Sequence, residues 1–447
     1  MSQLSNKWIY VILTLVTLLG LQLRLQAVRY TEVDTPVRAD ARGYLLYAIN
    51  LKQFHTYSRS PDALEGKVAT PAPDALRAPG YPLFMRLFVG DSVSDKMLLN
   101  IELAQALLST LTILLAYVAF AALLKPSLAL LVALFTAISP HLITANVYLL
   151  SESLFCFLLL SFLWLLSRWR LHPHCLLLLS TGLILGLATL TRPWTQYFIL
   201  FLVPLIAMAA PLQRPNRAAL IIFVGFIVPV GFWMMRNLST LGVVGDDTLT
   251  INTLHHGLYP GMMYENKPET LGYPYRFDPH ATEIGASMSS VLSEIVRRFR
   301  EYPLEYLQWH LFGKPVMLFS WNIFEGMGDV FTYPVLRTPY AEFQLFKATH
   351  WIMQTLHYWL VGLAGIGCLA AWLPGTDKGL GVEQRFFALC VSILFIYFVL
   401  IHCIGAPFAR YSIPMQPVVY GMAMFGLWHL RNLSKLLVAI AASRHSR

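Results

Sequence analysis

Two acidic residues lie at the edges of apolar stretches. A charge at such a position is more often functional than a means of keeping the protein soluble. Asp40 opens the stretch DARGYLLYAINL, and Glu152 lies in LLSESLF beside a long apolar run. A carboxylate at the start of a helix is held ionised by the backbone N–H groups of the first turn. A carboxylate close to hydrocarbon is costly and is usually functional. Both residues are therefore candidates for a site that moves a proton.

Basic residues accompany these acids along the chain. Arg77 lies in RAPGYP, Arg192 in LTRPW and Arg410 in PFARYS. Each of them alone could be an interfacial anchor whose charged end reaches the lipid headgroups. Two carboxylates and several arginines at one membrane face instead indicate a site that binds a polyanion and moves a proton. That is the chemistry of a phosphate-linked substrate held in the membrane.

The composition places these residues in a membrane protein. The 447 residues are 56% hydrophobic and only 13% charged, whereas soluble proteins carry about 25% charged residues. The net charge of +9 does not indicate a nucleic-acid partner, because the basic residues are spread over short loops rather than gathered on one face. None of the five cysteines forms a CxxC pair, so the sequence predicts no disulfide framework and no cysteine metal site.

Ten apolar segments follow one another, and we expect an all-α integral membrane protein with about ten transmembrane helices. The segments are Trp8–Val28, Ile101–Leu124, Leu128–Ala145, Leu149–Leu166, Leu176–Leu190, Tyr197–Ala210, Ala219–Met235, Trp351–Leu373, Phe386–Cys403 and Ile413–Leu430. The first is too long for a signal peptide and lacks a small-residue cleavage site, so we expect a retained anchor.

The positions of the basic residues predict how the chain crosses the membrane. Short loops on one side carry a basic excess, which is typical of the cytoplasmic face. Both termini are therefore expected inside, and residues 29–100 and 236–350 outside. We expect residues 1–235 to form a transmembrane core with a catalytic first outer loop. Residues 236–350 would form an outer substrate loop, and residues 351–447 the last transmembrane helices with a short basic tail.

The two outer segments contain amphipathic stretches and a pair of histidines. The apolar residues of 41–51 and 289–300 have helical spacing, which predicts helices lying along the membrane surface. Lys314 could contact a lipid phosphate or anchor the chain at the interface. His255 and His256 are adjacent, a spacing that does not suit a paired metal motif, so a polar loop is favoured over a metal site.

The order of the motifs resembles that of a known family. An N-terminal span is followed by DARGYLLYAINL, RAPGYPLFMRLF, SESLF, TRP, RNLSTLG and, near the end, PFARYSIPMQP. This set looks like the membrane-embedded C-type (GT-C) glycosyltransferases that use polyprenyl-phosphate sugars, of the protein O-mannosyltransferase and lipid A aminoarabinose transferase types. The resemblance runs over about the first 240 residues and reappears weakly at Lys314 and at Arg410–Pro417.

The resemblance implies roles for the acidic residues. The first outer loop of the family carries an acid that serves as catalytic base or binds a metal. Asp40 matches that acid, with Asp34 as a weaker match for which a turn role is favoured. Ala41 stands where a second acid is common, which weakens the case for a divalent metal ion at this pair. Glu152 matches the acid of the second outer loop.

The resemblance also implies how the donor is held. RAPGYP matches a segment that closes over the donor, where Gly80 would permit a tight turn and Arg77 and Tyr81 would contact the donor and its phosphate. Arg192 matches a basic residue near the lipid phosphate, and an arginine fork suits such a group. Lys314 and Arg410 would add further charge for the leaving phosphate.

The implied activity is an inverting transfer of a single sugar from a polyprenyl-phosphate donor to a hydroxyl acceptor on lipid A, a glycan or a secreted protein. The enzyme would lie among the lipids of a bacterial inner membrane with its site facing the periplasm. An oligosaccharide ligase with a lipid-diphosphate donor is the nearest alternative. A transporter or flippase of lipid-linked glycans is another, but such proteins show internal repeats and midplane charges, and the sequence shows neither.

Overall fold

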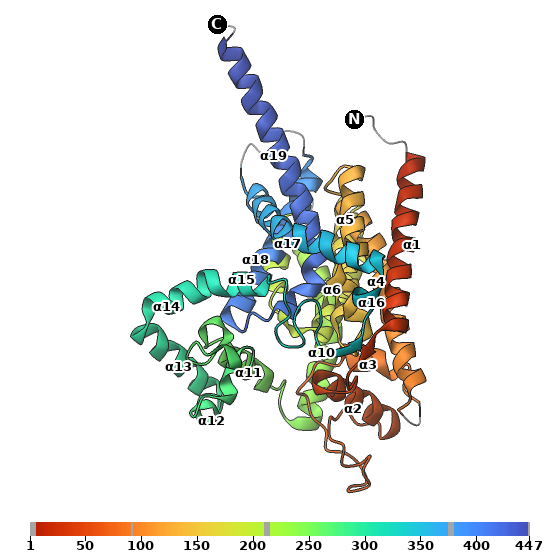
Figure 1. The fold of residues 1–447 in the computed structure, drawn as a ribbon, viewed down its shortest axis with the longest axis vertical. Coiled ribbons are helices and arrows are strands. Elements are labelled where there is room, and N and C mark those ends of the chain that lie inside the picture. The colour runs from red at the N-terminus through yellow and green to blue at the C-terminus, as the bar shows by residue number, and fades with distance from the viewer. Residues whose placement is uncertain (1–5, 91–92, 210–214, 374–379, 446–447) are drawn as a thin grey trace.

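The computed structural model describes residues 6–90, 93–209, 215–373 and 380–445, and its architecture is almost entirely helical (Figure 1). The helices are α1 (Asn6–Tyr30), α2 (Ala39–Gln53), α3 (Gly80–Arg86), α4 (Asp95–Phe120), α5 (Pro126–Ile138), α6 (Pro140–Thr144), α7 (Glu152–Leu171), α8 (Cys175–Thr191), α9 (Ile199–Ala209), α10 (Pro215–Leu241), α11 (Thr248–His256), α12 (Ala281–Ile284), α13 (Met288–Glu301), α14 (Pro303–Gln308), α15 (Lys314–Leu318), α16 (Pro339–Glu342), α17 (Gln344–Ala370), α18 (Val382–Ile404) and α19 (Gln416–His445). Two short strands, β1 (Glu32–Val33) and β2 (Val335–Arg337), pair antiparallel.

Six helices in the described residues are long and apolar enough to cross a membrane, and the bent pair formed by α5 with α6 and the turn after it would make a seventh. These six are α1, α4, α7, α10, α17 and α18. Each of the ten segments predicted from the sequence contains a helix in its described part, but α8 and α9 are shorter apolar helices. The all-α membrane class is confirmed, whereas ten complete crossings are not.

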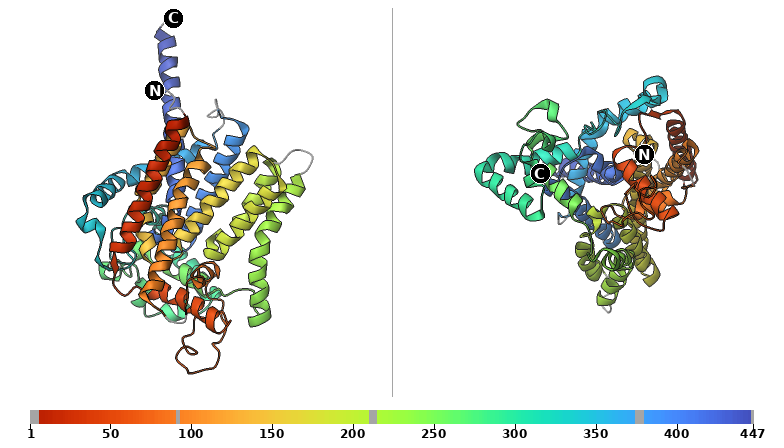
Figure 2. Two further views of the ribbon diagram at one scale, coloured as in Figure 1. Left: turned by 90° about the vertical axis from the view of Figure 1, so that its right-hand side faces the viewer. Right: turned by 90° about the horizontal axis from the view of Figure 1, so that it is seen from below.

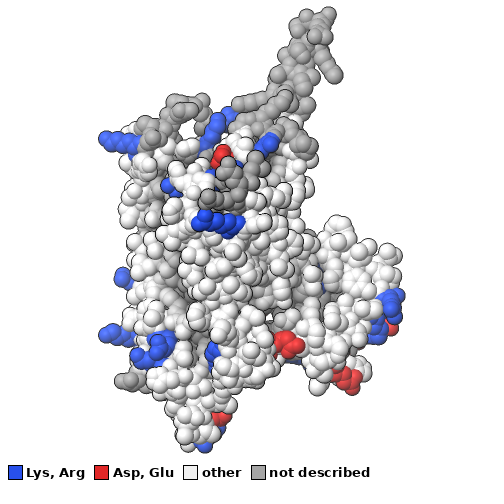
Figure 3. Space-filling view, turned by 180° about the vertical axis from the view of Figure 1, so that it is seen from behind, with Lys and Arg blue, Asp and Glu red and all other residues white. Residues whose placement is uncertain are grey.

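The helix bundle has two distinct ends. The start of α1 and the end of α19 lie at one end, and α2 with its following loop lies at the other (Figures 1 and 2). On the face that Figure 3 shows, charged side chains gather toward the two ends, and a broad band between them is nearly free of charge. Such a band is what a surface in contact with lipid requires, because each charge placed in hydrocarbon is costly.

A buried arginine stabilises the point where α5 ends at Ile138 and the chain bends by 51° into α6. Pro140 lacks an N–H group, so the carbonyl of Thr136 loses its helical partner. Arg24 of α1 supplies the missing donor, because its Nη2 binds the Thr136 carbonyl at 2.9 Å and its Nη1 binds the Ala137 carbonyl at 2.9 Å. Its Nε also donates to Ser109 Oγ of α4 at 2.7 Å. No sequence motif distinguishes Arg24 from the other basic residues near the ends of apolar segments.

Glycines allow a close helix contact within the bundle, between α8 and α10. A Cβ atom on Gly182 would collide with the carbonyl oxygen of Ile222, and one on Gly225 would collide with that of Leu179. Gly186 lies one turn further along α8 and meets Phe226 in the same way. Small residues four apart are the usual means of close approach between helices in a membrane.

The chain between α10 and α17 divides into two parts. Residues from α11 to α14 lie beside the bundle (Figure 1) and enclose a small apolar cluster of their own, with Ile251 and Val291 in it. Residues 318–346 instead belong to the main core. The pairing of β1 with β2, with Glu32 opposite Arg337, joins this second part to the end of α1. The predicted helices at 41–51 and 289–300 are confirmed as α2 and α13.

We expect Arg24→Met to lower the free energy of unfolding by about 2–5 kcal/mol, because it leaves buried carbonyls without donors. Arg29→Met, on the exposed side of the same helix, is the matched control and should change it by less than about 0.5 kcal/mol. Thermal unfolding of the purified protein in detergent measures both. Equal midpoints for the two variants would contradict this account of the bend.

Candidate active site

Asp40 lies in the first turn of α2, but it is not the helix cap. The N-cap residue is Arg38, which makes no side-chain capping bond, so the predicted capping role of Asp40 is wrong. Ala39, immediately before Asp40, has a φ of 43°, in the left-handed region that residues with a Cβ rarely adopt. Backbone strain of this kind persists only where the surrounding structure imposes it, and it is common beside functional groups.

Both carboxylate oxygens of Asp40 accept hydrogen bonds from arginines. Arg77 Nη2 donates to Oδ1 at 2.6 Å, and Arg410 Nη2 donates to Oδ2 at 2.7 Å. The guanidinium of Arg77 also lies over the ring of Tyr44, 4.8 Å from its centroid. The Asp40 side chain keeps 29% of its surface exposed, so a substrate can reach it.

Glu152 continues this ion-paired chain on the inner side. Its Oε1 accepts a hydrogen bond from Arg410 Nε at 2.8 Å and pairs with Arg192 Nη2 at 2.5 Å. Arg192 Nε in turn donates to Ser151 Oγ at 3.1 Å. The side chain of Glu152 is only 2% exposed. The five residues Arg77, Asp40, Arg410, Glu152 and Arg192 therefore form one alternating chain of charges, which we call the charge relay cluster.

The segment RAPGYP is held by close packing rather than by a special turn. Gly80 begins α3 without a positive φ, and a Cβ there would lie 2.7 Å from the carbonyl oxygen of Leu190. The glycine therefore serves a close approach to the end of α8, next to Arg192. Tyr81 is completely buried, and its hydroxyl donates to Gln105 Oε1 at 2.7 Å. It anchors α3 to α4, and its hydroxyl does not reach the charge relay cluster.

The charges of the cluster reinforce one another. Burial raises the pKa of Asp40, but Arg410 and Arg77 lower it by more, so that this pKa lies well below its ordinary value. Burial lowers the pKa of Arg410, but Glu152 and Asp40 raise it well above its usual value. Three guanidinium groups and two carboxylates leave one positive charge over. The cluster is thus suited to a ligand with one negative charge.

Lys314 lies outside the charge relay cluster. Its Nζ binds the Gly405 carbonyl at 2.8 Å and His310 Nε2 at 3.0 Å. The side chain is fully buried, and burial lowers its pKa to about 7. Because Gly405 lies in the turn between α18 and Arg410, Lys314 fixes the segment that carries Arg410 into the cluster. This places it as a support of the site rather than as a contact for phosphate.

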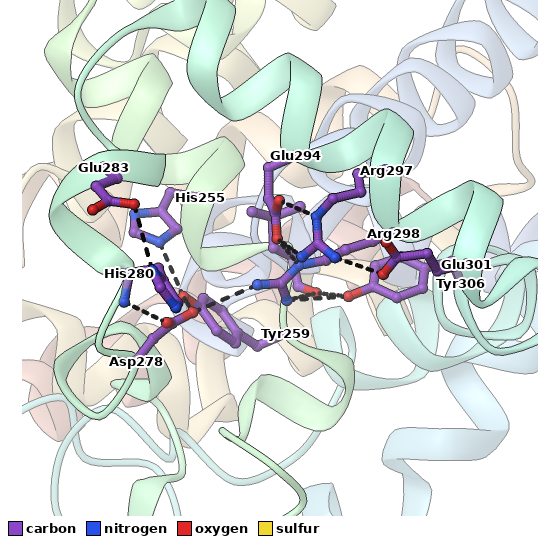
Figure 4. Close-up of polar contacts among 11 residues, drawn as sticks. His255, Tyr259, Asp278, His280, Glu283, Glu294, Arg297, Arg298, Glu301 and Tyr306 are labelled. Atoms are coloured by element: carbon purple, nitrogen blue, oxygen red, sulfur yellow. Dashed lines mark hydrogen bonds and ion pairs between the residues drawn. The ribbon is translucent and has the colours of Figure 1, made fainter.

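The adjacent histidines face different partners. His255 Nε2 contacts the hydroxyl of Tyr259 at 3.0 Å, and this hydroxyl donates to Asp278 Oδ2 at 2.7 Å (Figure 4). His256 instead stacks on Tyr275 with 4.3 Å between ring centroids. Figure 4 shows that the His255 network continues through Arg298 to the acids of α13, so it is a polar core of the unit formed by α11–α14.

The acids of the cluster do not fit a divalent metal ion. Both oxygens of Asp40 and one oxygen of Glu152 are already bound by guanidinium groups. In residues 6–90, 93–209, 215–373 and 380–445, no group of three or more His, Cys, Asp or Glu side chains is arranged to hold a metal. Asp34 does not join the cluster either, since its Oδ1 accepts a hydrogen bond from Thr35 at 3.2 Å.

A third carboxyl group, not identified from the sequence, lies beside Arg410. Glu325 belongs to the loop between α15 and β2, and the charge and the backbone of Arg410 both act to lower the pKa of its carboxyl. Burial raises its pKa to about 7. It lies in NIFEGMGD, a glycine-containing loop with no apolar period, so no pattern distinguishes it from an ordinary surface acid.

An apolar groove leads from the surface to this loop. It has a volume of about 990 Å³ and is lined by Trp309, Phe312, Val316, Met317, Phe324 and Gly326, among others. Phe312 and Val316 are 66% and 69% exposed, so the outer side of the groove presents apolar side chains. At its other side, Phe324 and Gly326 flank Glu325 in the chain. The groove therefore joins an apolar surface to the neighbourhood of the charge relay cluster.

Family models and curated protein sequences give no match to the chain. Among solved structures it is similar to the oligosaccharyltransferase AglB of Archaeoglobus fulgidus, in complex with an inhibitory peptide and a dolichol-phosphate. The TM-score is 0.53 at 14% identity, over 98% of this chain and 52% of that chain. The oligosaccharyltransferase of this organism tethered to an acceptor peptide gives a TM-score of 0.51 at 14% identity, over 94% and 49%.

This likeness concerns the fold. The chain spans about half the length of the solved structures it matches, and its fold is similar to that of the matched half. The all-α membrane fold expected from the sequence is supported at this level. The finer resemblance to the O-mannosyltransferase and aminoarabinose transferase types stays a prediction.

We expect Arg410→Met to lower the free energy of unfolding by about 3–5 kcal/mol, because two buried or half-buried carboxylates each lose a partner. Arg410→Lys should cost less, since it keeps the charge, but a lysine cannot bridge two acids as a fork does. Adding Glu152→Gln to Arg410→Met should lower the free energy of unfolding further, because Glu152 still pairs with Arg192 in the single variant and its loss leaves that arginine without a carboxylate. Thermal unfolding measures all three, with the exposed Arg431→Lys as control. A single variant that is as stable as the wild type would contradict the bridging role.

Proposed function

We propose that the protein is an inverting glycosyltransferase that moves a single sugar from a polyprenyl-phosphate donor to a hydroxyl acceptor. The observation that carries this proposal is the charge relay cluster, in which Arg410 joins Asp40 to Glu152 while Arg77 pairs with Asp40 and Arg192 with Glu152. It combines a proton acceptor with guanidinium groups for a phosphate. The shared fold with an oligosaccharyltransferase supports glycosyl transfer.

The apolar groove supports a lipid-linked donor. A polyprenyl chain needs an apolar path that ends near the phosphate site, and the groove runs from exposed Phe312 and Val316 to Phe324. Phe324 packs against Phe408, with 6.1 Å between ring centroids, two residues before Arg410. The polyprenyl tail would lie in this groove, and the donor phosphate would meet Arg410 and Arg77.

In the transfer step, the oxygen of the acceptor hydroxyl attacks the anomeric carbon of the donor sugar. The bond between that carbon and the phosphate oxygen breaks, and the single displacement inverts the anomeric centre. The hydroxyl proton passes to Asp40, and the leaving polyprenyl phosphate keeps the second negative charge. Arg77, Arg410 and Arg192 stabilise this developing charge. Arg77 and Arg410 would turn partly from Asp40 to the phosphate, which makes Asp40 more basic when donor is bound.

An oligosaccharide ligase with a lipid-diphosphate donor is the second candidate, favoured by the fold it shares with AglB. The charge of the site discriminates between the two. The five residues of the charge relay cluster carry one positive charge in excess, which balances the single negative charge of a phosphodiester, whereas a diphosphate brings at least two. An ionised Glu325 beside Arg410 makes the site less positive still and so disfavours a diphosphate further. We therefore place the single-sugar donor first.

The site would face the periplasm of a bacterial inner membrane. Helix α2, whose first turn carries Asp40, lies at the end of the bundle opposite the start of α1 and the end of α19 (Figure 1). With both termini in the cytoplasm, as the basic loops predict, this end is the outer one. The acceptor would then be lipid A, a glycan or a secreted protein.

We expect Asp40→Asn to reduce sugar transfer by about 10²–10⁴-fold, because the proton acceptor is lost. Membranes with wild type or variant receive a radiolabelled polyprenyl-phosphate sugar, and the label that leaves the lipid is measured. Asp34→Asn is the matched control and should keep its activity. The unfolding midpoint of each variant shows whether the fold is intact. Substantial transfer by a folded Asp40→Asn protein would sink the assignment.

The same assay separates the reaction classes. We expect label to move from a polyprenyl-phosphate sugar and not from a polyprenyl-diphosphate oligosaccharide, because the excess charge of the site matches only the former. Transfer from the diphosphate alone would establish the ligase. Label that stays on the lipid but changes leaflet would establish a flippase and overturn the transferase proposal.

A further inference from the structure

We propose that Glu325 is a further substrate-binding residue of this site, whose Oε2 accepts a hydrogen bond from a hydroxyl group of a substrate. The inference rests on the proposed sugar transfer, in which both the acceptor and the donor sugar present hydroxyl groups. It adds to the charge relay cluster a third acid that takes no part in the ion pairs of the other two.

The contacts of Glu325 leave one oxygen for a ligand. The backbone amides of Glu325 itself and of Arg410 act on this carboxyl and lower its pKa. Its Oε2 is buried and has no hydrogen-bond partner among the residues that the structure describes. A buried carboxylate oxygen without a donor costs about 1–3 kcal/mol or more, so such an atom calls for an explanation. A donor brought by the substrate supplies one.

A second carboxylate oxygen in the site is also buried without a hydrogen-bond donor. Glu152 Oε2 is also buried without a hydrogen-bond partner in the described part of the chain, while Glu152 Oε1 holds both Arg192 and Arg410. Glu152 and Glu325 both act on Arg410, one through its side chain and one through its backbone. Two unused acceptors beside one arginine suit a ligand rich in hydroxyl groups, as sugars are.

The position of Glu325 also fits a substrate contact. It lies between Phe324 and Gly326, which line the apolar groove proposed for the polyprenyl chain. On its other side is Arg410, which binds Asp40 at 2.7 Å. A hydroxyl bound at Glu325 would therefore lie between the lipid path and the proton acceptor, where the sugar is transferred.

The charge of Glu325 changes near neutral pH. Burial raises its pKa to about 7, although Arg410 and the backbone amides act to lower it. The other groups that face it are Glu152, Tyr273 and Tyr411. Burial raises the pKa of Tyr411 to about 12, and burial together with Glu325 raises that of Tyr273, so neither tyrosine titrates between pH 5.5 and 8.5. Asp40, with its depressed pKa, stays ionised over that range.

The test compares Glu325→Gln with the wild type in apparent KM and in stability. The donor is the radiolabelled polyprenyl-phosphate sugar, and the acceptor is supplied as graded amounts of envelope extract from the expressing host. We expect the apparent KM for one of the two substrates to rise about 10-fold or more, because the glutamine amide presents a donor where an acceptor is needed. A higher apparent KM for the envelope extract assigns the bound hydroxyl to the acceptor. A higher apparent KM for the polyprenyl-phosphate sugar assigns it to the donor sugar.

The wild type adds a pH signature. Its apparent KM for that substrate should rise as the pH falls below about 7, since protonated Glu325 loses its capacity to accept at Oε2, and Glu325→Gln should show no such change. Glu269→Gln, an exposed acid of the same outer segment, is the matched control and should follow the wild type.

Stability separates a substrate contact from a structural role. Glu325→Gln keeps one oxygen for the backbone amides and removes an unpaired charge, so its unfolding midpoint should equal or exceed that of the wild type. A lower midpoint, or an unchanged KM for both substrates, would overturn the role of Glu325. Failure of the wild type to transfer label would instead refute the proposed function.

Discussion

The structure of the site depends on one arginine. Arg410 donates to Asp40, 370 residues earlier in the chain, and to Glu152, 258 residues earlier. These bonds join the surface helix α2, the start of α7 and the turn before α19. Removing either acid leaves its outer arginine, Arg77 or Arg192, without a carboxylate, and removing Arg410 takes one donor from each acid, so the ion pairs depend on one another. The stability of the cluster therefore lies in the connected set of ion pairs rather than in any single pair.

The same charges limit the chemistry of the site before a substrate arrives. With both oxygens held by guanidinium groups, Asp40 is ionised but weakly basic. A phosphate that competes for these groups would weaken their hold on Asp40, so donor binding and base strength are coupled through Arg77 and Arg410. Such coupling favours a proton acceptor that becomes effective only when the donor is in place. Lys314 contributes indirectly, since it holds the turn at Gly405 from which the chain reaches Arg410.

Buried polar groups have the same function in the bundle and in the site. Arg24 supplies a donor to a carbonyl that Pro140 deprives of its own, and so permits a bend inside an apolar helix pair. Hydrocarbon offers no water to satisfy such groups, so each break in a helix needs a side chain nearby. The orphaned oxygens of Glu152 and Glu325 are two of seven buried side-chain atoms without a partner in the described residues, and these two lie where a substrate would bind.

The sequence by itself determined the class of protein, because about twenty consecutive apolar residues can hardly be anything but a membrane helix. It also identified Asp40, Glu152, Arg77, Arg192 and Arg410, since charges at the ends of apolar segments stand out against their surroundings. It could not show that these five residues form one cluster, because no local pattern records contacts between residues hundreds of positions apart. Tertiary structure alone decided that Tyr81 and Lys314 are buried supports, that Gly80 serves a close approach, and that His255 and His256 face different partners. Glu325 lies in a loop without periodicity, and only the fold brings it beside Arg410.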